Sequence, residues 1–248
     1  MNSFIGWIGG KKLLRKEIIA RFPEEYGRYI EVFGGAGWVL FGREPKAGQL
    51  EVFNDANGDL VNLFRCVKYH AEAVQQELDW LLSSREIFTD FLADRHRMTD
   101  IQRAARYFYL IKTSFGCDTR TFGTASQPLE KATDYLATVK HRLNGVVIEN
   151  LDFERLIHIY DRSDALFYLD PPYHGTERYY QAAFADADHQ RLRDVLQGVK
   201  GKWVLSYNDD DYIRDLYKDY RVEGIERNST LSGDSNSRKY KELIIRNY

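Results

Sequence analysis

Residues 165–173 read Ala-Leu-Phe-Tyr-Leu-Asp-Pro-Pro-Tyr, an apolar run that stops at a carboxylate, two prolines and an aromatic ring. The apolar run predicts a buried strand. Asp and Pro are ordinary turn residues, so a plain turn after that strand is one interpretation. The chain has only five prolines, however, and two of them stand together where an open α/β sheet places its ligand crevice, past a strand's carboxyl end. The stretch therefore favours an α/β sheet with a site at this strand end.

The same residues suit chemistry at a planar amino group. The lone pair of such an amine is delocalised into its ring, and two acceptors on its two N–H bonds would localise it. Asp170 offers a carboxylate, and Pro171 offers a backbone carbonyl on a segment stiffened by Pro172. Tyr173 offers a face on which an unpaired base can stack, which needs the ring rather than the hydroxyl.

Strand-like and helical patterns alternate along most of the chain. Helical stripes, such as the one formed by Leu60, Leu63 and Phe64, separate most of the strand-like runs. This alternation predicts an α/β fold with a doubly wound, mainly parallel, seven-stranded sheet of Rossmann-like type. The last two strands are expected to form an antiparallel ribbon at one edge. The predicted strands are residues 29–33, 50–54, 146–150, 165–169, 203–207, 221–226 and 243–248.

Residues 71–144 break this alternation, because nearly all of their apolar spacing is helical. They predict a helical insert, and residues 1–70 and 145–248 then form the catalytic domain. Between residues 84 and 142 there are ten Lys or Arg against seven Asp or Glu, with aromatic residues interleaved. A solvated helical face over a small aromatic core is the alternative to a surface that binds nucleic acid.

A glycine-rich turn follows the first predicted strand. Gly34, Gly35 and Gly37 would let the backbone turn sharply and approach a ligand closely. Asp55 ends the next strand 20 residues after Gly35, the spacing at which an acid meets a ribose hydroxyl. The pattern predicts an adenosine-containing cofactor, which could be a dinucleotide or S-adenosylmethionine.

Composition restricts the class of protein. The 248 residues include 35 Lys or Arg and 37 Asp or Glu, a formal charge of -2, so any polyanion would have to meet a local basic patch. Cys66 and Cys117 form no close pair and no metal-ligand cluster, so no metal is expected. No apolar stretch is long enough for a membrane span or a signal peptide. We therefore expect an intracellular, cytoplasmic protein in a reducing environment, with no membrane partner.

Two further segments carry basic groups. Residues 7–12, Trp-Ile-Gly-Gly-Lys-Lys, place a flexible turn between an aromatic residue and a basic pair, and residues 232–241 form a polar, basic tail segment. A surface lead-in to a helix and a solvated loop are the plain interpretations. Neither segment indicates a function by itself.

Taken in order, these segments resemble the Dam-type adenine-specific DNA methyltransferases. In that class the cofactor motif comes first, the target-recognition insert second and the catalytic Asp-Pro-Pro-Tyr last. The resemblance covers nearly the whole chain. The segments that carry it are residues 4–14, 33–37, 54–57, 170–173, 205–209 and 238–248.

The resemblance implies transfer of a methyl group from S-adenosyl-L-methionine to the 6-amino nitrogen of a flipped adenine in double-stranded DNA. Flipping is physically required, because an amine inside a paired stack is unavailable to a methyl donor. The catalytic residues it implies are Asp170, Pro171, Pro172 and Tyr173. The cofactor-binding residues it implies are Trp7, Lys11, Phe33, Gly34, Gly35, Gly37, Asp55 and Asp170. A restriction nuclease partner is not implied.

Candidates for DNA contacts come from the basic segments. Arg120 lies in a polar, glycine-bearing stretch where a loop could enter a groove and pair its guanidinium with guanine. Arg103 and Arg106 lie on a predicted helix and are candidates for phosphate contacts or plain solvated charges. Arg238 and Lys239 in the tail complete the set.

The chain departs from the family pattern in three places. Val32 stands where the family usually has Pro, and Trp38 stands where a small residue is common. Residues 112–127 are shorter than the usual recognition loop and lack its Asn-Gly core, so no target sequence follows.

The alternative functions differ in the role that each would give to the Asp-Pro-Pro-Tyr motif. Methylation of a cytosine amine or of an RNA adenine poses the same lone-pair problem and is the nearest alternative, although Asp170 in place of Ser favours adenine. A DNA-binding relative that has lost catalysis would not need the intact motif. A nicotinamide oxidoreductase would give the motif no evident role.

Overall fold

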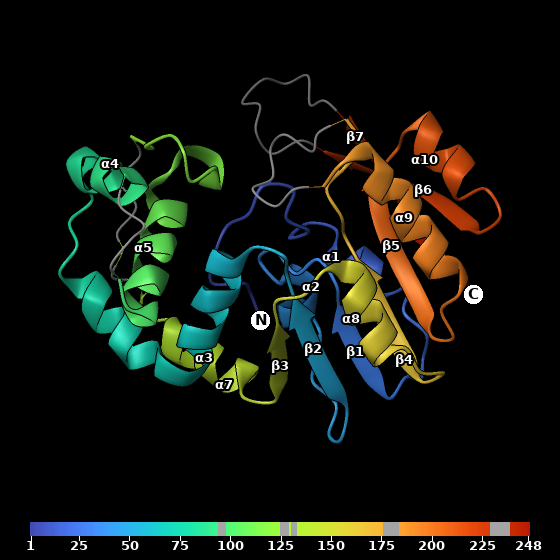
Figure 1. Ribbon diagram of the computed structural model, residues 1–248, viewed down its shortest axis with the longest axis horizontal. Coiled ribbons are helices and arrows are strands. Elements are labelled where there is room, and N and C mark those ends of the chain that lie inside the picture. The colour runs from blue at the N-terminus through green and yellow to red at the C-terminus, as the bar shows by residue number, and fades with distance from the viewer. Residues whose placement is uncertain (94–97, 125–128, 130–132, 176–183, 229–238) are drawn as a thin grey trace.

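The computed structural model describes residues 1–93, 98–124, 129, 133–175, 184–228 and 239–248. It contains a seven-stranded sheet in the order β3-β2-β1-β4-β5-β7-β6, with helices on both faces (Figure 1). Strands β1 to β5 pair in parallel, and β7 is antiparallel to both β5 and β6. The predicted mainly parallel α/β sheet with an antiparallel ribbon at one edge is confirmed. The strands are β1 (Arg28–Glu31), β2 (Leu50–Asn54), β3 (Val146–Glu149), β4 (Ala165–Leu169), β5 (Lys202–Asn208), β6 (Arg221–Asn228) and β7 (Lys239–Arg246).

Strand β4 lies at the centre of the sheet and is buried at all five positions. Successive side chains of a strand point to opposite faces. Leu166 and Tyr168 accordingly belong to one hydrophobic cluster, whereas Phe167 and Leu169 belong to another on the opposite face. The uninterrupted apolar run in the sequence is therefore the signature of a strand covered on both sides.

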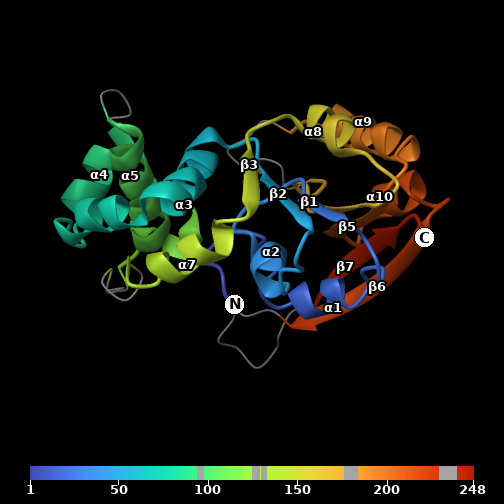
Figure 2. The same cartoon turned by 90° about the horizontal axis from the view of Figure 1, so that it is seen from below.

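Helices of different parts of the chain cover the two faces, as Figure 2 shows. One face is covered by α8 (Phe153–Tyr160), α9 (Asp186–Gln197) and α10 (Asp211–Leu216), which contribute residues to the same cluster as Phe167. The other is covered by α1 (Arg15–Ile19), α2 (Trp38–Gly42) and the start of α3 (Gly58–Asp79). Within the described residues, no helix is both long and apolar enough to cross a membrane.

A group of helices lies beyond the β3 edge of the sheet (Figure 1). Helix α3 starts this group and is bent at His70, whose φ of -137° and ψ of 38° are not helical. Helix α3 packs against both α5 and α7. Phe64 and Phe108 share one hydrophobic cluster with Phe53 of the sheet. Assigning residues 71–144 to a separate target-recognition insert stays a prediction. The remaining members of the group are α4 (Arg85–Ala93), α5 (Asp100–Thr113), the 3-10 turn η1 (Phe115–Cys117) and α7 (Leu136–Leu143).

The strand order reverses between β1 and β4, which lie side by side in the sheet although far apart in sequence. Glu31 pairs with Tyr168 in register, and the Val32 N–H donates to the Tyr168 carbonyl over 2.9 Å. From β1 the chain continues toward β2 on one side, and from β4 it continues toward β5 on the other. Such a switch point opens a crevice at the carboxyl ends of the strands. The glycine-rich turn and Asp170 both lie at that end.

Candidate active site

The Asp-Pro-Pro-Tyr motif starts where β4 ends, as the sequence predicts. The Asp170 side chain is 18% exposed, and its carboxylate accepts a hydrogen bond from Ser206 Oγ of β5 over 2.9 Å. Pro171 and Pro172 are buried directly after it. Burial raises the pKa of Asp170, and the neighbouring Lys11 ammonium opposes that rise.

Lys11 is the cation that faces this carboxylate. It is 5% exposed, and its Nζ lies 2.7 Å from both Asp170 oxygens, although the two residues are 159 positions apart in sequence. Its ammonium also donates to the Gly9 carbonyl over 3.0 Å. The lysine predicted to contact the cofactor thus lies against the Asp170 carboxylate, where its charge opposes the rise in the pKa of that group.

The Tyr173 ring is fixed from two directions. Its hydroxyl donates to Glu242 Oε2 of β7 over 2.8 Å, and its ring centroid lies 6.1 Å from that of Tyr207. The Lys11 Nζ is 4.8 Å from the Tyr173 ring centroid. The Tyr173 hydroxyl therefore has a partner, Glu242, that no motif or spacing indicates.

The glycine-rich turn adopts backbone conformations that favour glycine. Gly35 has a φ of 48° and Gly37 a φ of 67°, both in the left-handed region. A Cβ on Gly34 would overlap the Phe53 ring, and a Cβ on Gly35 would lie 2.8 Å from Trp7 Nε1. The sharp turn is confirmed. The close approach that excludes a side chain at Gly34 and Gly35 is to aromatic rings of the protein itself.

Asp55 ties this turn to the end of β2. Its Oδ2 accepts the Gly35 N–H and its Oδ1 accepts the Asn57 N–H, each over 2.8 Å. Burial raises the pKa of Asp55, while these two backbone hydrogen bonds oppose the rise. The carboxylate therefore holds two loops together, whatever ligand it also meets.

The predicted cofactor residues, except Gly37, line one cleft between these loops. Gly37 instead precedes α2 as its N-cap. The lining residues from the predicted set are Trp7, Lys11, Phe33, Gly34, Gly35, Asp55 and Asp170.

A second set of residues, which were not predicted from the sequence, lines the same cleft. Asp152 and Phe153 follow β3 at the carboxyl edge of the sheet, and Phe184 and Arg191 lie beside them. The Arg191 guanidinium is 4.0 Å from the Phe153 ring centroid and 2.9 Å from the Asp152 carboxylate. The position of Asp152 and Phe153 after a strand's carboxyl end was the available signal. Phe184 precedes α9 and Arg191 lies on it, so the same rule does not indicate them.

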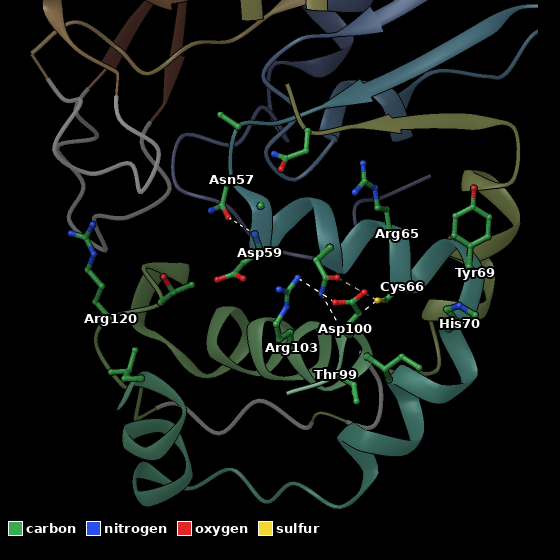
Figure 3. A pocket seen from close by; sticks show the side chains of 17 residues that line it. Asn57, Asp59, Arg65, Cys66, Tyr69, His70, Thr99, Asp100, Arg103 and Arg120 are labelled. Atoms are coloured by element: carbon green, nitrogen blue, oxygen red, sulfur yellow. Dashed lines mark hydrogen bonds and ion pairs between the residues drawn. The ribbon is translucent and has the colours of Figure 1, made fainter. Parts of the chain in front are cut away.

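A wider groove of about 1180 Å³ adjoins the cleft, and Figure 3 shows it from close by. Ala56 and Asn57 line both spaces. Two of the predicted DNA-contact residues, Arg103 on α5 and Arg120 after η1, line the groove together with Arg65 of α3.

Arg120 stands on a tight turn. The N–H groups of Arg120 and Thr121 donate to one Asp118 oxygen, over 2.8 and 2.9 Å. Thr119 adopts a φ of 56°, and Arg120 is exposed. Arg103 is partly exposed, and its Nη2 lies 3.6 Å from an Asp100 oxygen.

None of the other three residues predicted to contact DNA is among the described residues that line the groove. Arg106 is only 3% exposed, and its Nε donates to the Phe91 carbonyl of α4. A phosphate cannot reach a side chain that is buried between α4 and α5, so Arg106 is corrected from a DNA contact to a structural residue. Arg238 lies outside the described residues, as does the side chain of Lys239 at the start of β7. Within the described part of the chain, no three His, Cys, Asp or Glu side chains gather as a metal site requires.

Comparison with known proteins agrees with this geometry. A model of the family described as D12 class N6 adenine-specific DNA methyltransferase matches residues 7–231. The chain is 29% identical to the Type II methyltransferase M1.LlaDCHI of Lactococcus lactis subsp. cremoris, over 100% of this chain and 96% of the relative. It is 25% identical to a DNA adenine methylase of Haemophilus influenzae, over 98% and 92% of the two chains. It is also 25% identical to the Type II methyltransferase M.CviBI of Paramecium bursaria Chlorella virus NC1A, over 100% of both.

Proposed function

Because the chain belongs to the D12 class N6 adenine-specific DNA methyltransferase family, we propose that it moves the methyl group of S-adenosylmethionine to the 6-amino nitrogen of a flipped adenine. The proposal is carried by one observation. Asp170, held by Ser206 and Lys11, closes one end of a cleft whose other walls carry the glycine-rich turn and Asp55.

The cleft fits the proposed cofactor in its chemistry. Asp55 follows β2, and Asp152 follows β3. Both supply carboxylate oxygens of the kind that accept ribose hydroxyls. The rings of Phe33, Phe153 and Phe184 lie within 6.0 Å of one another and supply an apolar wall suited to a purine. S-adenosylmethionine would bring an electrophilic methyl group to this cleft. A pyrophosphate is less well served, because these side chains are acidic or aromatic.

Asp170 acts on the amine in the proposed mechanism. Its carboxylate would accept one N–H of the base and the Pro171 carbonyl would accept the other, which would localise the nitrogen lone pair. The nitrogen would bond to the methyl carbon as the bond from that carbon to sulfur breaks, and the methylated nitrogen would lose one proton to solvent. The Ser206 hydroxyl fixes the carboxylate through its 2.9 Å hydrogen bond. Most of the catalytic effect then comes from positioning and from exclusion of water.

Tyr173 receives the flipped base in this proposal. Its ring lies three residues after Asp170, and its hydroxyl is anchored to Glu242. A ring held in a fixed plane loses little freedom when a base stacks on it, and such stacking is worth about 1–3 kcal/mol per base.

The groove beside the cleft is the proposed path for DNA. Arg65, Arg103 and Arg120 line it, and it reaches the cleft at Ala56 and Asn57. Acidic groups of the same groove, such as Asp100, limit its net charge, which fits a surface that reads bases as well as phosphates. Relatives carry the names of both Type II methyltransferases and a DNA adenine methylase, so a restriction nuclease is not part of the proposal.

Labelled methyl transfer tests the proposal directly. The protein is incubated with double-stranded DNA and methyl-labelled S-adenosylmethionine, and the nucleosides are separated after digestion. We expect the label in N6-methyladenine. Label in N4-methylcytosine, or label only with RNA, would support the nearest alternatives instead. DNA binding without any transfer would indicate a catalytically silent relative.

A further inference from the structure

The buried charges near Asp170 include a second carboxylate, which comes from β7, two strands away from β4 in the sheet. Glu242 of β7 is 3% exposed and lies opposite Asn208 of β5 in register. Its Oε2 is 3.9 Å from the Lys11 Nζ, and the same oxygen accepts the Tyr173 hydroxyl over 2.8 Å. One ammonium thus stands between two carboxylates in the described part of the site.

Lys11 in this position binds the Asp170 carboxylate, which the proposed reaction needs as an acceptor for the base amine. It lies 2.7 Å from both oxygens of Asp170, and Ser206 also binds Oδ1. An arriving base amine needs one of those oxygens as its acceptor. An amine hydrogen that arrives at Oδ2 shares that oxygen with the ammonium. Sharing weakens the existing contact and favours a shift of the buried ammonium toward a second acceptor.

Glu242 is placed to receive that ammonium. A movement of about 1 Å would shorten the present 3.9 Å separation to the usual length of a charge-assisted hydrogen bond. The movement stays within the buried site, because Lys11 and Glu242 are both almost fully enclosed.

We propose that Glu242 is a positioning residue for methyl transfer. It binds the Lys11 ammonium when the base amine takes its place on Asp170, and it anchors the Tyr173 hydroxyl so that the ring keeps the plane on which the base stacks. This inference rests on the proposed function, because it requires an amine at Asp170.

Among the residues that the structure describes, charged and titratable groups near Glu242 belong to the N-terminal segment, to β4 and to the turn after β4. They are Lys11 of the N-terminal segment, Tyr168 of β4, and Asp170 and Tyr173 after it. The charge of Glu242 raises the pKa of Asp170, whereas Lys11 lowers it. Removing the charge of Glu242 should therefore lower the pKa of Asp170 and extend its ionised form to lower pH.

Glu242→Gln tests the role, because it keeps the shape and an acceptor for Tyr173 but removes the charge. We expect kcat to fall about 10- to 100-fold, the size of effect that loss of exact positioning produces. The Kd for S-adenosylmethionine and the KM for DNA should change little. The acid limb of the kcat–pH profile should move to lower pH, because the charge that raises the pKa of Asp170 is gone. A purely structural role would not confine the loss to kcat. An unchanged kcat with an unchanged acid limb would overturn the inference.

Two further variants complete the experiment. Glu25→Gln makes the same chemical change at an exposed position and should behave as wild type. Tyr173→Phe removes the hydroxyl and leaves the charge, so kcat should fall several-fold while the acid limb stays in place. If Glu242→Gln does not fold, Tyr173→Phe still decides, because a wild-type kcat in that variant would contradict the anchoring role. A wild-type protein that transfers no methyl group would refute the proposed function itself.

Discussion

Removing the Asp55 carboxylate should weaken cofactor binding and also loosen the protein before any ligand binds. Asp55 accepts two backbone N–H groups, one from Gly35 and one from Asn57, each over 2.8 Å. A hydrogen bond to a charged group contributes about 1.5–3 kcal/mol, so the two together contribute roughly 3–6 kcal/mol before costs. Burial opposes this gain, as the raised pKa of Asp55 indicates. We therefore expect a net loss of about 1–3 kcal/mol for Asp55→Ala.

That loss should lower the Tm, and loss of the proposed ribose contact, of similar size, should separately raise the Kd. Calorimetric titration with S-adenosylmethionine should give a Kd about 5- to 150-fold higher than that of the wild type. The Tm measured without ligand should fall by roughly 2–4 °C for each kcal/mol lost. Asp90→Ala, at an exposed aspartate of α4, is the matched control and should change neither quantity.

The pair of measurements separates two roles for the carboxylate. A higher Kd with an unchanged Tm would mean that Asp55 acts on the ligand alone, and the loop-holding argument would be wrong. An unchanged Kd in a folded Asp55→Ala protein would remove Asp55 from the cofactor site altogether.

Three other predictions concern the reacting group, the DNA surface and pH. Asp170→Ala should abolish methyl transfer in the labelled-DNA assay but keep DNA affinity in fluorescence anisotropy, because most affinity comes from phosphates; normal turnover would refute the mechanism. Arg120→Ala should relax preference at one base of the mapped site, measured as methylation rates across single-base variants, whereas Arg103→Ala should weaken affinity uniformly and flatten its salt dependence; a wild-type ranking would show that Arg120 reads no base. Burial raises the pKa of Glu31 from 4.5 to about 8, so the folded protein holds a proton that the unfolded chain releases between these values, and stability falls as pH rises through that window. Glu31→Gln removes this dependence, so its stability relative to wild type in urea unfolding should grow by roughly 1.4 kcal/mol per pH unit within the window; a difference independent of pH would contradict a raised pKa.

The elements that the sequence predicted well are those whose signal is local. The apolar run of β4 predicts a buried strand, and the glycines after β1 predict a sharp turn, because in each case the residues themselves determine the local conformation. Their meeting followed from the rule that sites form past the carboxyl ends of parallel strands, which placed Asp170 and Asp55 in one cleft.

The residues that were missed or wrong depend on three-dimensional neighbours. Ser206 binds Asp170 because β5 pairs with β4, and Glu242 comes close to Lys11 because β7 pairs with β5. No local spacing in the sequence reports that strand order. Arg106 was wrong for a related reason. Helix α5 is enclosed on most of its sides by α3 and α4, so an arginine that reads as a surface charge is in fact buried.

The position of β7 also has a consequence for how the molecule assembles. Strand β6 pairs only with β7 in the described sheet, although β6 comes first along the chain, and β7 alone joins it to β5. Pairing of β6 must therefore wait for β7, and the contacts of β7 with the middle of the sheet are long-range and slow to form. Glu242 arrives with that strand. We therefore expect the surroundings of Lys11 and Tyr173 to be completed only when β7 pairs with β5. Backbone amides of β6 and β7 should then gain protection from hydrogen exchange together.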